Sequence, residues 1–368
     1  MPAARKVILN IGVILFALLV AFIGLEVLFR IYLSQTASET IQLLYTGTRE
    51  DFRERTSVVG QPYIGFGLTQ TFPTQNEQGY RGEPIAPKQP DEYRIVAVGA
   101  STTYGFGLET AEEAYPAQLE QALHDAGQTE VKVVNAGVPS YTTWESTANL
   151  AFRVVDLQPD LVIIYHAGND VGARMVDPAQ YTGLNAARGT WQHYDEPLPR
   201  SAIIRLVALN NDWMENPLWY ETYLETATPY MACDVDTDGF CTNLDLSALD
   251  VLEQNPPVYF ERNLKTMIAI ARIHGSDVML STWAYDIVSS PEGVDTMRAD
   301  FRQQGVDEHN AVTQAIADEF ETLFFDLADV FPSDPELWID GVHLTAEGTQ
   351  LQAELYADYL LATVFAQD

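Results

Sequence analysis

The chain has 368 residues, of which 47% are hydrophobic and 20% are charged, so it can fold around one large core or two smaller ones and is not a disordered polymer. Its 52 acidic residues outnumber its 20 basic residues and give a formal net charge of -32 at pH 7. A surface this negative repels phosphate backbones, which excludes nucleic acid as a general partner. Two cysteines are too few for a disulfide scaffold or a cysteine-built zinc site.

The first feature along the chain is an apolar stretch over residues 7–29, in which Asn10 and Glu26 are the clearly polar members. As a helix it would span roughly 34 Å, enough to cross the hydrocarbon core of a bilayer. A cleavable signal peptide is the alternative, but the stretch is longer than a signal core and no A-x-A site follows it. We therefore predict that residues 1–33 form an uncleaved, single-pass anchor that contacts the bilayer through residues 7–29.

A polar segment follows, and then strands alternate with helices. Residues 34–90 are rich in Gly, Pro and Gln and are interpreted as a stalk and lead-in. Short apolar runs predict strands at 93–98, 131–134, 161–165, 278–280 and 323–326. Helical spacing predicts helices at 111–126, 142–157, 260–274, 310–321 and 345–365. This alternation predicts an α/β domain over residues 91–368, a three-layer α/β/α sandwich with a mostly parallel five-stranded sheet. An acidic, aromatic insertion at about 171–257 interrupts it.

Four polar clusters follow strands or precede the last helix, where ligands bind in parallel sheets. They are Gly99 to Thr103, Asn135 to Gly137, Gly168 to Asp170, and Asp340 to His343. Asp340, three residues before His343, can fix the tautomer of that ring and leave its other nitrogen as a base for the Ser101 hydroxyl. Taken singly, each cluster is also typical of a helix cap or an ordinary turn.

Together, the blocks GAST at 99–102, NAG at 135–137, GND at 168–170 and DGVH at 340–343 resemble those of the SGNH, or GDSL-type, hydrolases, in particular a membrane-anchored bacterial type. The resemblance implies a flavodoxin-like fold and catalysis without a cofactor. It implies Ser101 as the nucleophile, His343 as the base and Asp340 as its orienting carboxylate. It also implies an oxyanion hole built from the Ser101 N–H, Gly137 and Asn169. We expect the nearby His166 and Asp170 to be structural.

One motif lies inside the insertion. Asp234, Asp236 and Asp238 precede Gly239 in the D-x-D-x-D-G pattern that begins a calcium loop, in which the Phe240 carbonyl and Asp245 would be the later ligands. Cys233 and Cys241 bracket this loop and are predicted to form a disulfide. An acidic surface turn with two free thiols is the alternative. Calcium and an oxidising milieu both favour a catalytic domain outside the cytoplasm.

The sequence thus predicts an extracytoplasmic, membrane-anchored serine esterase whose substrate is an ester, with an acylated carbohydrate as the candidate because aromatic residues are frequent in the insertion. Two alternatives stay open at this point. The same residues would serve an O-acyltransferase that modifies a cell-surface polysaccharide, and a catalytically inactive surface-binding module would keep the fold without the reaction.

Overall fold

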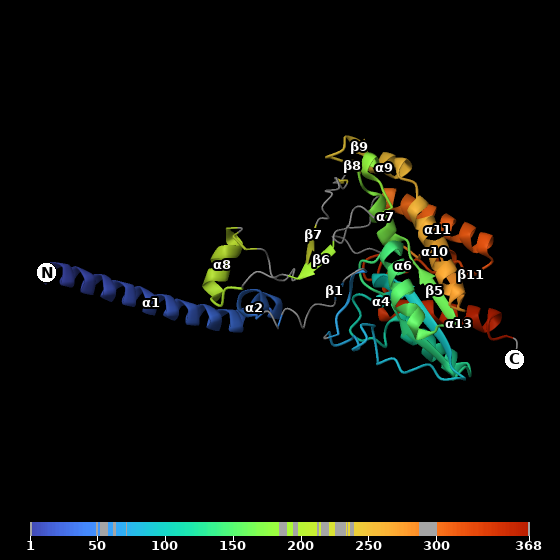
Figure 1. Cartoon of the computed structure of the whole chain (residues 1–368), viewed down its shortest axis with the longest axis horizontal. Helices are drawn as coiled ribbons and strands as arrows, with labels where there is room; N and C mark the ends of the chain where they lie inside the picture. Colours follow the sequence, from blue (N-terminus) through green and yellow to red (C-terminus); the bar gives the residue numbers. More distant parts are fainter. Residues whose placement is uncertain are drawn as a thin grey trace. The chain divides into compact units, whose positions relative to one another are not determined.

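The structure is a computed structural model, and Figure 1 colours the chain along its sequence. It describes residues 2–48, 51, 58–61, 64–70, 72–183, 190–193, 198–211, 213–214, 221–224, 233, 235, 239–286 and 300–366. The chain divides into two compact units. The first comprises Met1–Ser57 and Gln192–Thr222, and the second comprises Val58–Trp191 and Tyr223–Asp368.

In the part of the first unit that the structure describes, the helices are α1 (Pro2–Thr36), α2 (Glu39–Thr46) and α8 (Ala202–Asn210). Within α1, the segment Lys6–Thr36 is long and apolar enough to cross a membrane, and none of its most apolar window is buried inside the protein. A signal sequence near an N-terminus passes the same test of length and composition. The predicted membrane anchor therefore stays a prediction at this stage.

The second unit is built on a parallel sheet of five strands: β3 (Tyr93–Gly99), β4 (Val131–Asn135), β5 (Leu161–Tyr165), β10 (Asp277–Ser281) and β11 (Leu323–Phe325). Their spatial order is β11-β10-β5-β3-β4. The central pairing matches Ile95 with Leu161 and Gly99 with Tyr165, so β3 and β5 end at the same edge. This confirms the predicted α/β fold with a parallel five-stranded sheet, and its strand order is that of flavodoxin-like folds.

Helices cover both faces of the sheet because alternate strand residues point to opposite sides. Ile95, Leu161 and Met279 pack on one face with α5 (Tyr115–Asp125) and α13 (Ala346–Thr363). Val96, Val162 and Leu280 pack on the other face with α6 (Thr143–Phe152) and α10 (Val258–Ile273). The helix α11 (Asp300–Phe320) contributes to both layers. The core thus holds the sheet edge, where the polar clusters emerge, in a fixed position.

Smaller elements connect this frame. Among the described residues, the other helices are α4 (Ser101–Tyr104), α7 (Gly168–Arg174), α9 (Ala248–Gln254) and α12 (Leu327–Val330), and the 3-10 turns are Val154–Leu157, Pro178–Gln180 and Pro335–Leu337. Two-stranded sheets pair β1 (Val58–Gln61) with β2 (Gly65–Leu68), β6 (Thr190–His193) with β7 (Glu221–Leu224), and β8 (Phe240–Cys241) with β9 (Leu246–Ser247). Phe66 and Leu68, from the predicted lead-in, are buried with Tyr104 and Tyr141 beside the sheet.

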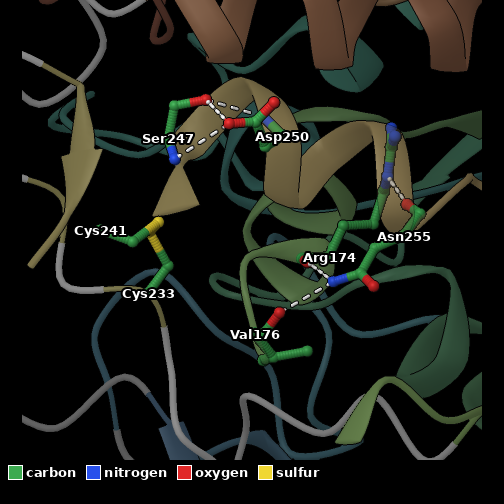
Figure 2. Close-up of a disulfide and its surroundings, with 7 residues drawn as sticks. All are labelled: Arg174, Val176, Cys233, Cys241, Ser247, Asp250 and Asn255. Carbon is green, nitrogen blue, oxygen red and sulfur yellow. Dashed lines mark hydrogen bonds between the residues drawn. A yellow bond between two sulfur atoms is a disulfide. The ribbon is translucent and has the colours of Figure 1, made fainter. Parts of the chain in front are cut away.

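The last part of the insertion belongs to the second unit and contains a disulfide and a capped helix (Figure 2). Cys233 and Cys241 are joined as predicted, with their Cα atoms 5.0 Å apart. The Ser247 side chain caps α9, and at the end of that helix the buried Asn255 amide donates to the carbonyls of Arg174 and Val176, at 2.7 and 2.9 Å. These contacts attach the end of the insertion to α7, whose first residues lie at the sheet edge.

Candidate active site

Ser101 lies where the sheet meets its first helix. Strand β3 ends at Gly99, Ala100 caps α4, and Ser101 is the first residue of that helix. A Cβ at Gly99 would come within 1.9 Å of the Thr103 hydroxyl, so glycine is the residue that permits this sharp turn. The serine hydroxyl therefore stands at the carboxyl edge of the central strand. Strand β3 lies between β4 and β5, which are the second and third parallel strands along the chain. The strand order therefore reverses at β3, and the hydroxyl lies at this switch point of the sheet.

Three side chains from opposite ends of the second unit form a continuous hydrogen-bond chain. The Oγ of Ser101 is 2.9 Å from Nε2 of His343. The Nδ1 of the same ring is 2.8 Å from Oδ2 of Asp340. A carboxylate on Nδ1 holds the proton on that nitrogen and leaves Nε2 as an acceptor for the serine proton. The arrangement can therefore activate the Ser101 hydroxyl.

The loop that carries Asp340 and His343 is held by its own backbone. The second oxygen of Asp340, Oδ1, accepts from the N–H groups of Val342 and His343, at 3.0 and 2.8 Å. Gly341, between them, has φ of +76°, which an L side chain rarely adopts. Burial alone would raise the pKa of Asp340, but the hydrogen bonds from the His343 ring and from these two N–H groups outweigh it. The pKa of Asp340 thus lies below its ordinary value, and the carboxylate remains charged beside the ring.

Asn169 comes from the first turn of α7, directly after β5. Its Nδ2 donates one hydrogen to the carbonyl of Tyr141, at 2.9 Å, which fixes the orientation of the amide. Asn169 and Ser101 line the same cavity, and the amide has a second hydrogen besides the one given to Tyr141. An amide of this kind is a suitable donor to an oxyanion.

Gly137 lies in the loop after β4, next to the backbone of α4. Its N–H donates to Oδ1 of Asn135, at 3.0 Å, and the residue is buried against the backbone of α4. Gly137 therefore supports the helix that carries Ser101, and its part in an oxyanion hole remains a prediction. Three residues further on, Ser140 has φ of +70°, a left-handed conformation that costs a serine of order 1 kcal/mol or more. The sequence gives no signal for that strain.

His166 and Asp170 make hydrogen bonds within the fold, and their structural role stays a prediction. His166 is buried, with its Nε2 2.8 Å from the Ser146 hydroxyl. Asp170 accepts from the backbone N–H and the hydroxyl of Thr143, at 3.1 and 2.6 Å, and so joins the first turn of α7 to the first turn of α6. These bonds place the α7 terminus, and Asn169 with it, relative to the sheet.

A cavity of about 220 Å³ opens over these groups. It is lined by Ala100, Ser101, Thr102, His166, Ala167, Gly168, Asn169, Trp283, Arg302, Asp340, Val342 and His343. The Trp283 ring packs so closely over Gly168 that a Cβ there would meet it at 2.5 Å. Exposed Phe106, 5.1 Å from the His343 ring, lies beside the histidine. Sequence reasoning missed Trp283, Arg302 and Phe106, because none belongs to a recognisable motif.

Comparison with known proteins agrees with this geometry. Residues 97–351, well over half of the chain, match the GDSL-like Lipase/Acylhydrolase family. The chain belongs to this family. Its members are acylhydrolases, so the protein is an ester hydrolase, as the sequence predicted. A search of curated proteins gives no match.

Solved structures similar to this acylhydrolase include three bacterial enzymes. They are a lipase/acylhydrolase from Enterococcus faecalis (20% identity, 73% of this chain and 96% of the other, TM-score 0.43), a GDSL-like lipase from Bacteroides thetaiotaomicron (16%, 76% and 93%, 0.42) and an acetylxylan esterase from Geobacillus stearothermophilus (16%, 74% and 96%, 0.43). At these identities and scores they carry no inference about substrate.

The predicted calcium loop of this acylhydrolase is only partly described. Asp234, Asp236 and Asp238 lie outside the described residues. Gly239 has φ of +75°, as a tight turn requires, and Asp245 has φ of +56°. Among the described residues there is no group of three or more His, Cys, Asp or Glu side chains that could hold a metal ion. Calcium binding therefore stays a prediction.

Proposed function

We propose that this ester hydrolase is a membrane-anchored, extracytoplasmic serine esterase with Ser101 as its nucleophile, His343 as its general base and Asp340 as the carboxylate that orients the base. The observation that carries the proposal is the unbroken hydrogen-bond chain from Asp340 through His343 to Ser101, at the mouth of a cavity. A protein that only binds a surface has no need of this chain, which argues against the inactive-module alternative.

In the first half of the reaction, Oγ of Ser101 attacks the ester carbonyl carbon while Nε2 of His343 takes the hydroxyl proton. The carbonyl oxygen becomes an oxyanion, for which the second Asn169 amide hydrogen and the Ser101 N–H at the start of α4 are the proposed donors. The bond from carbon to the alcohol oxygen then breaks, and His343 returns its proton to that oxygen. An acyl-serine and a free alcohol result.

In the second half, water attacks the acyl-serine and gives a proton to His343. The bond between the acyl carbon and Oγ breaks, and the proton returns to Ser101, so the acid is released and the enzyme is restored. Asp340 stays ionised throughout and stabilises the imidazolium that forms twice in each turnover. If a sugar hydroxyl replaced water in this step, the same residues would perform the O-acyl transfer that the sequence left open.

We infer an acylated carbohydrate as the substrate class. The support is Phe106, an exposed aromatic ring beside the His343 ring, on which a sugar ring can stack. Of the aromatic residues of the insertion that first suggested this class, Trp219, Tyr220 and Tyr230 lie outside the described residues. Product analysis with and without a sugar acceptor separates hydrolysis from transfer.

The test of the nucleophile uses the full-length protein and a fluorophosphonate probe, which reacts with activated serines. We expect covalent labelling of the wild type on a peptide that contains Ser101, and no labelling or ester turnover in Ser101→Ala. Turnover of p-nitrophenyl esters near the wild-type rate in Ser101→Ala would refute the proposal. The anchor is tested separately, since an integral protein stays with membranes washed in alkaline carbonate.

A further inference from the structure

The insertion returns to the apolar N-terminal helix within the first unit. There, the Glu26 carboxylate of α1 accepts from the Ser201 hydroxyl and from the N–H groups of Ala202 and Ile203, at 2.7, 2.8 and 3.1 Å. Arg30, one turn further along α1, donates to the same carboxylate, at 2.7 Å. Ser201 to Ile203 form the N-terminus of α8, where the helix dipole favours a negative charge. The acidic residue of the apolar helix is thus paired by the insertion.

The two faces of α8 differ in polarity. Ala202, Arg205 and Ala208 share a buried face, on which Arg205 donates to the carbonyls of Pro199 and of Leu44 in α2, at 2.6 and 3.3 Å. Arg205 is the one charged residue of α8, so its burial leaves none on the outer side. That opposite face presents Ile204 and Val207, which are 48% and 43% exposed.

The position of α8 along α1 matches the edge of a bilayer. About 24 residues separate Lys6 from Arg30, or about 36 Å of helix, against a hydrocarbon thickness of about 30 Å. Arg30 and Glu26 then lie at the outer boundary when Lys6 lies at the inner one. Figure 1 shows α8 running crosswise to the C-terminal half of α1, so a helix attached at Glu26 extends along the membrane plane.

The side of α8 away from α2 is the side that meets lipid. Leu44 lies in α2, which follows the outer end of α1 in the sequence. Arg205 donates a hydrogen bond to the Leu44 carbonyl, so Ile204 and Val207 lie on the side of α8 opposite this contact. Trp213, just after α8, is 73% exposed, and tryptophan is typical of the boundary between acyl chains and headgroups. Ile204, Val207 and Trp213 are thus exposed apolar side chains in the same unit as α1.

We propose that α8, with Trp213, is a second membrane contact of this protein, and that its partner is the boundary between acyl chains and headgroups in the leaflet at the C-terminal end of α1. The inference rests on the proposed anchor, because it places α1 across the bilayer. The insertion would then contact the membrane more than 160 residues after the anchor in the sequence. Cleavage of α1 as a signal would remove Glu26 and leave the α8 terminus without its partner.

The experiment places an environment-sensitive fluorophore on α8 in the full-length protein. Val207→Cys is labelled with an NBD maleimide, since both native cysteines are in the disulfide, and reconstituted in phosphatidylcholine vesicles with or without acyl-chain doxyl lipid. Ile273→Cys, on α10 and 82% exposed, is the matched control. We expect a blue-shifted emission that doxyl lipid quenches for position 207, and neither effect for position 273.

Two further measurements separate the possible failures. Release of the protein by alkaline carbonate would refute the anchor and the inference together. A protein retained in the membrane with an unquenched label at position 207 would refute the inference alone. Introducing Glu26→Ala should reduce the quenching at position 207 while the protein remains in the membrane, because α8 loses its attachment. Unchanged quenching in that variant would show that Glu26 does not dock the helix.

Discussion

Gly137 offers a sharp test of how the active site is supported. The residue is buried beneath α4, and a Cβ at this position would lie 2.3 Å from the Tyr104 nitrogen and 2.7 Å from the Thr103 carbonyl carbon. Both atoms are backbone, so no flexible side chain can yield. An ordinary contact begins near 3.4 Å, which means that Gly137→Ala must displace α4 by about 1 Å. Ser101 is the first residue of that helix and would move with it.

A displacement of about 1 Å at a reacting group can cost about 100-fold in rate, or about 2.7 kcal/mol of transition-state stabilisation. We therefore expect kcat of Gly137→Ala to fall about 100-fold in an ester hydrolysis assay, with slower fluorophosphonate labelling of Ser101. The control is Gly172→Ala on α7, where an added Cβ meets nothing within 4 Å. That variant should keep its kcat and gain up to about 1 kcal/mol of stability as a better helix former. A Gly137→Ala enzyme within about threefold of the wild type would refute the steric reasoning, and melting curves of both variants show whether lost activity reflects lost fold.

Three other outcomes can be measured. Asn169→Ala should lower kcat by about 100-fold to 1,000-fold in the same assay, and an effect on KM alone would make Asn169 a substrate-binding residue. Burial, and to a lesser extent the charge of Arg174, lowers the pKa of His309 from 6.5 to about 3. Below pH 6.5 the unfolded chain therefore binds a proton at this histidine that the folded protein does not bind. The free energy of unfolding should therefore fall by about 2 kcal/mol between pH 7 and pH 5, as measured by urea unfolding. The same fall in His309→Gln would contradict this reasoning. Millimolar calcium should raise the melting temperature of the wild type but not of Asp236→Ala, and identical midpoints with EDTA would reduce the predicted loop to an acidic turn.

The positions of the strands could be predicted because buried parallel strands are short, continuous apolar runs. Leu161 to Tyr165 is a continuous apolar run, and the structure has a strand over the same residues. Helix ends were harder, since polar residues at a helix start resemble a loop. The helix expected from residue 310 begins at Asp300, and Gly168 to Asp170, which are also typical of a turn, begin the helix α7.

The candidate site could be predicted where function fixes residue type and order, and not where only shape matters. Ser101, Asp340 and His343 lie in recognisable blocks, and the structure brings their side chains together. Gly137 belongs to such a block too, but its hydrogen bond to Asn135 depends on how the loop closes in space. Trp283, two residues after the end of β10, lines the cavity and packs on a glycine of another element, a relation without a local sequence pattern.

The hydrogen bond between Ser101 and His343 joins residues 242 positions apart. At about 5–20 residues per second, roughly 10–50 s of synthesis separate the appearance of the proposed nucleophile from that of its proposed base. A nascent or truncated chain that ends just before Asp340 contains all five parallel strands, but it holds Ser101 without His343. Hydrolytic activity therefore begins only when the C-terminal segment has arrived and packed, so a single late folding step decides when this enzyme can first act on any ester it meets.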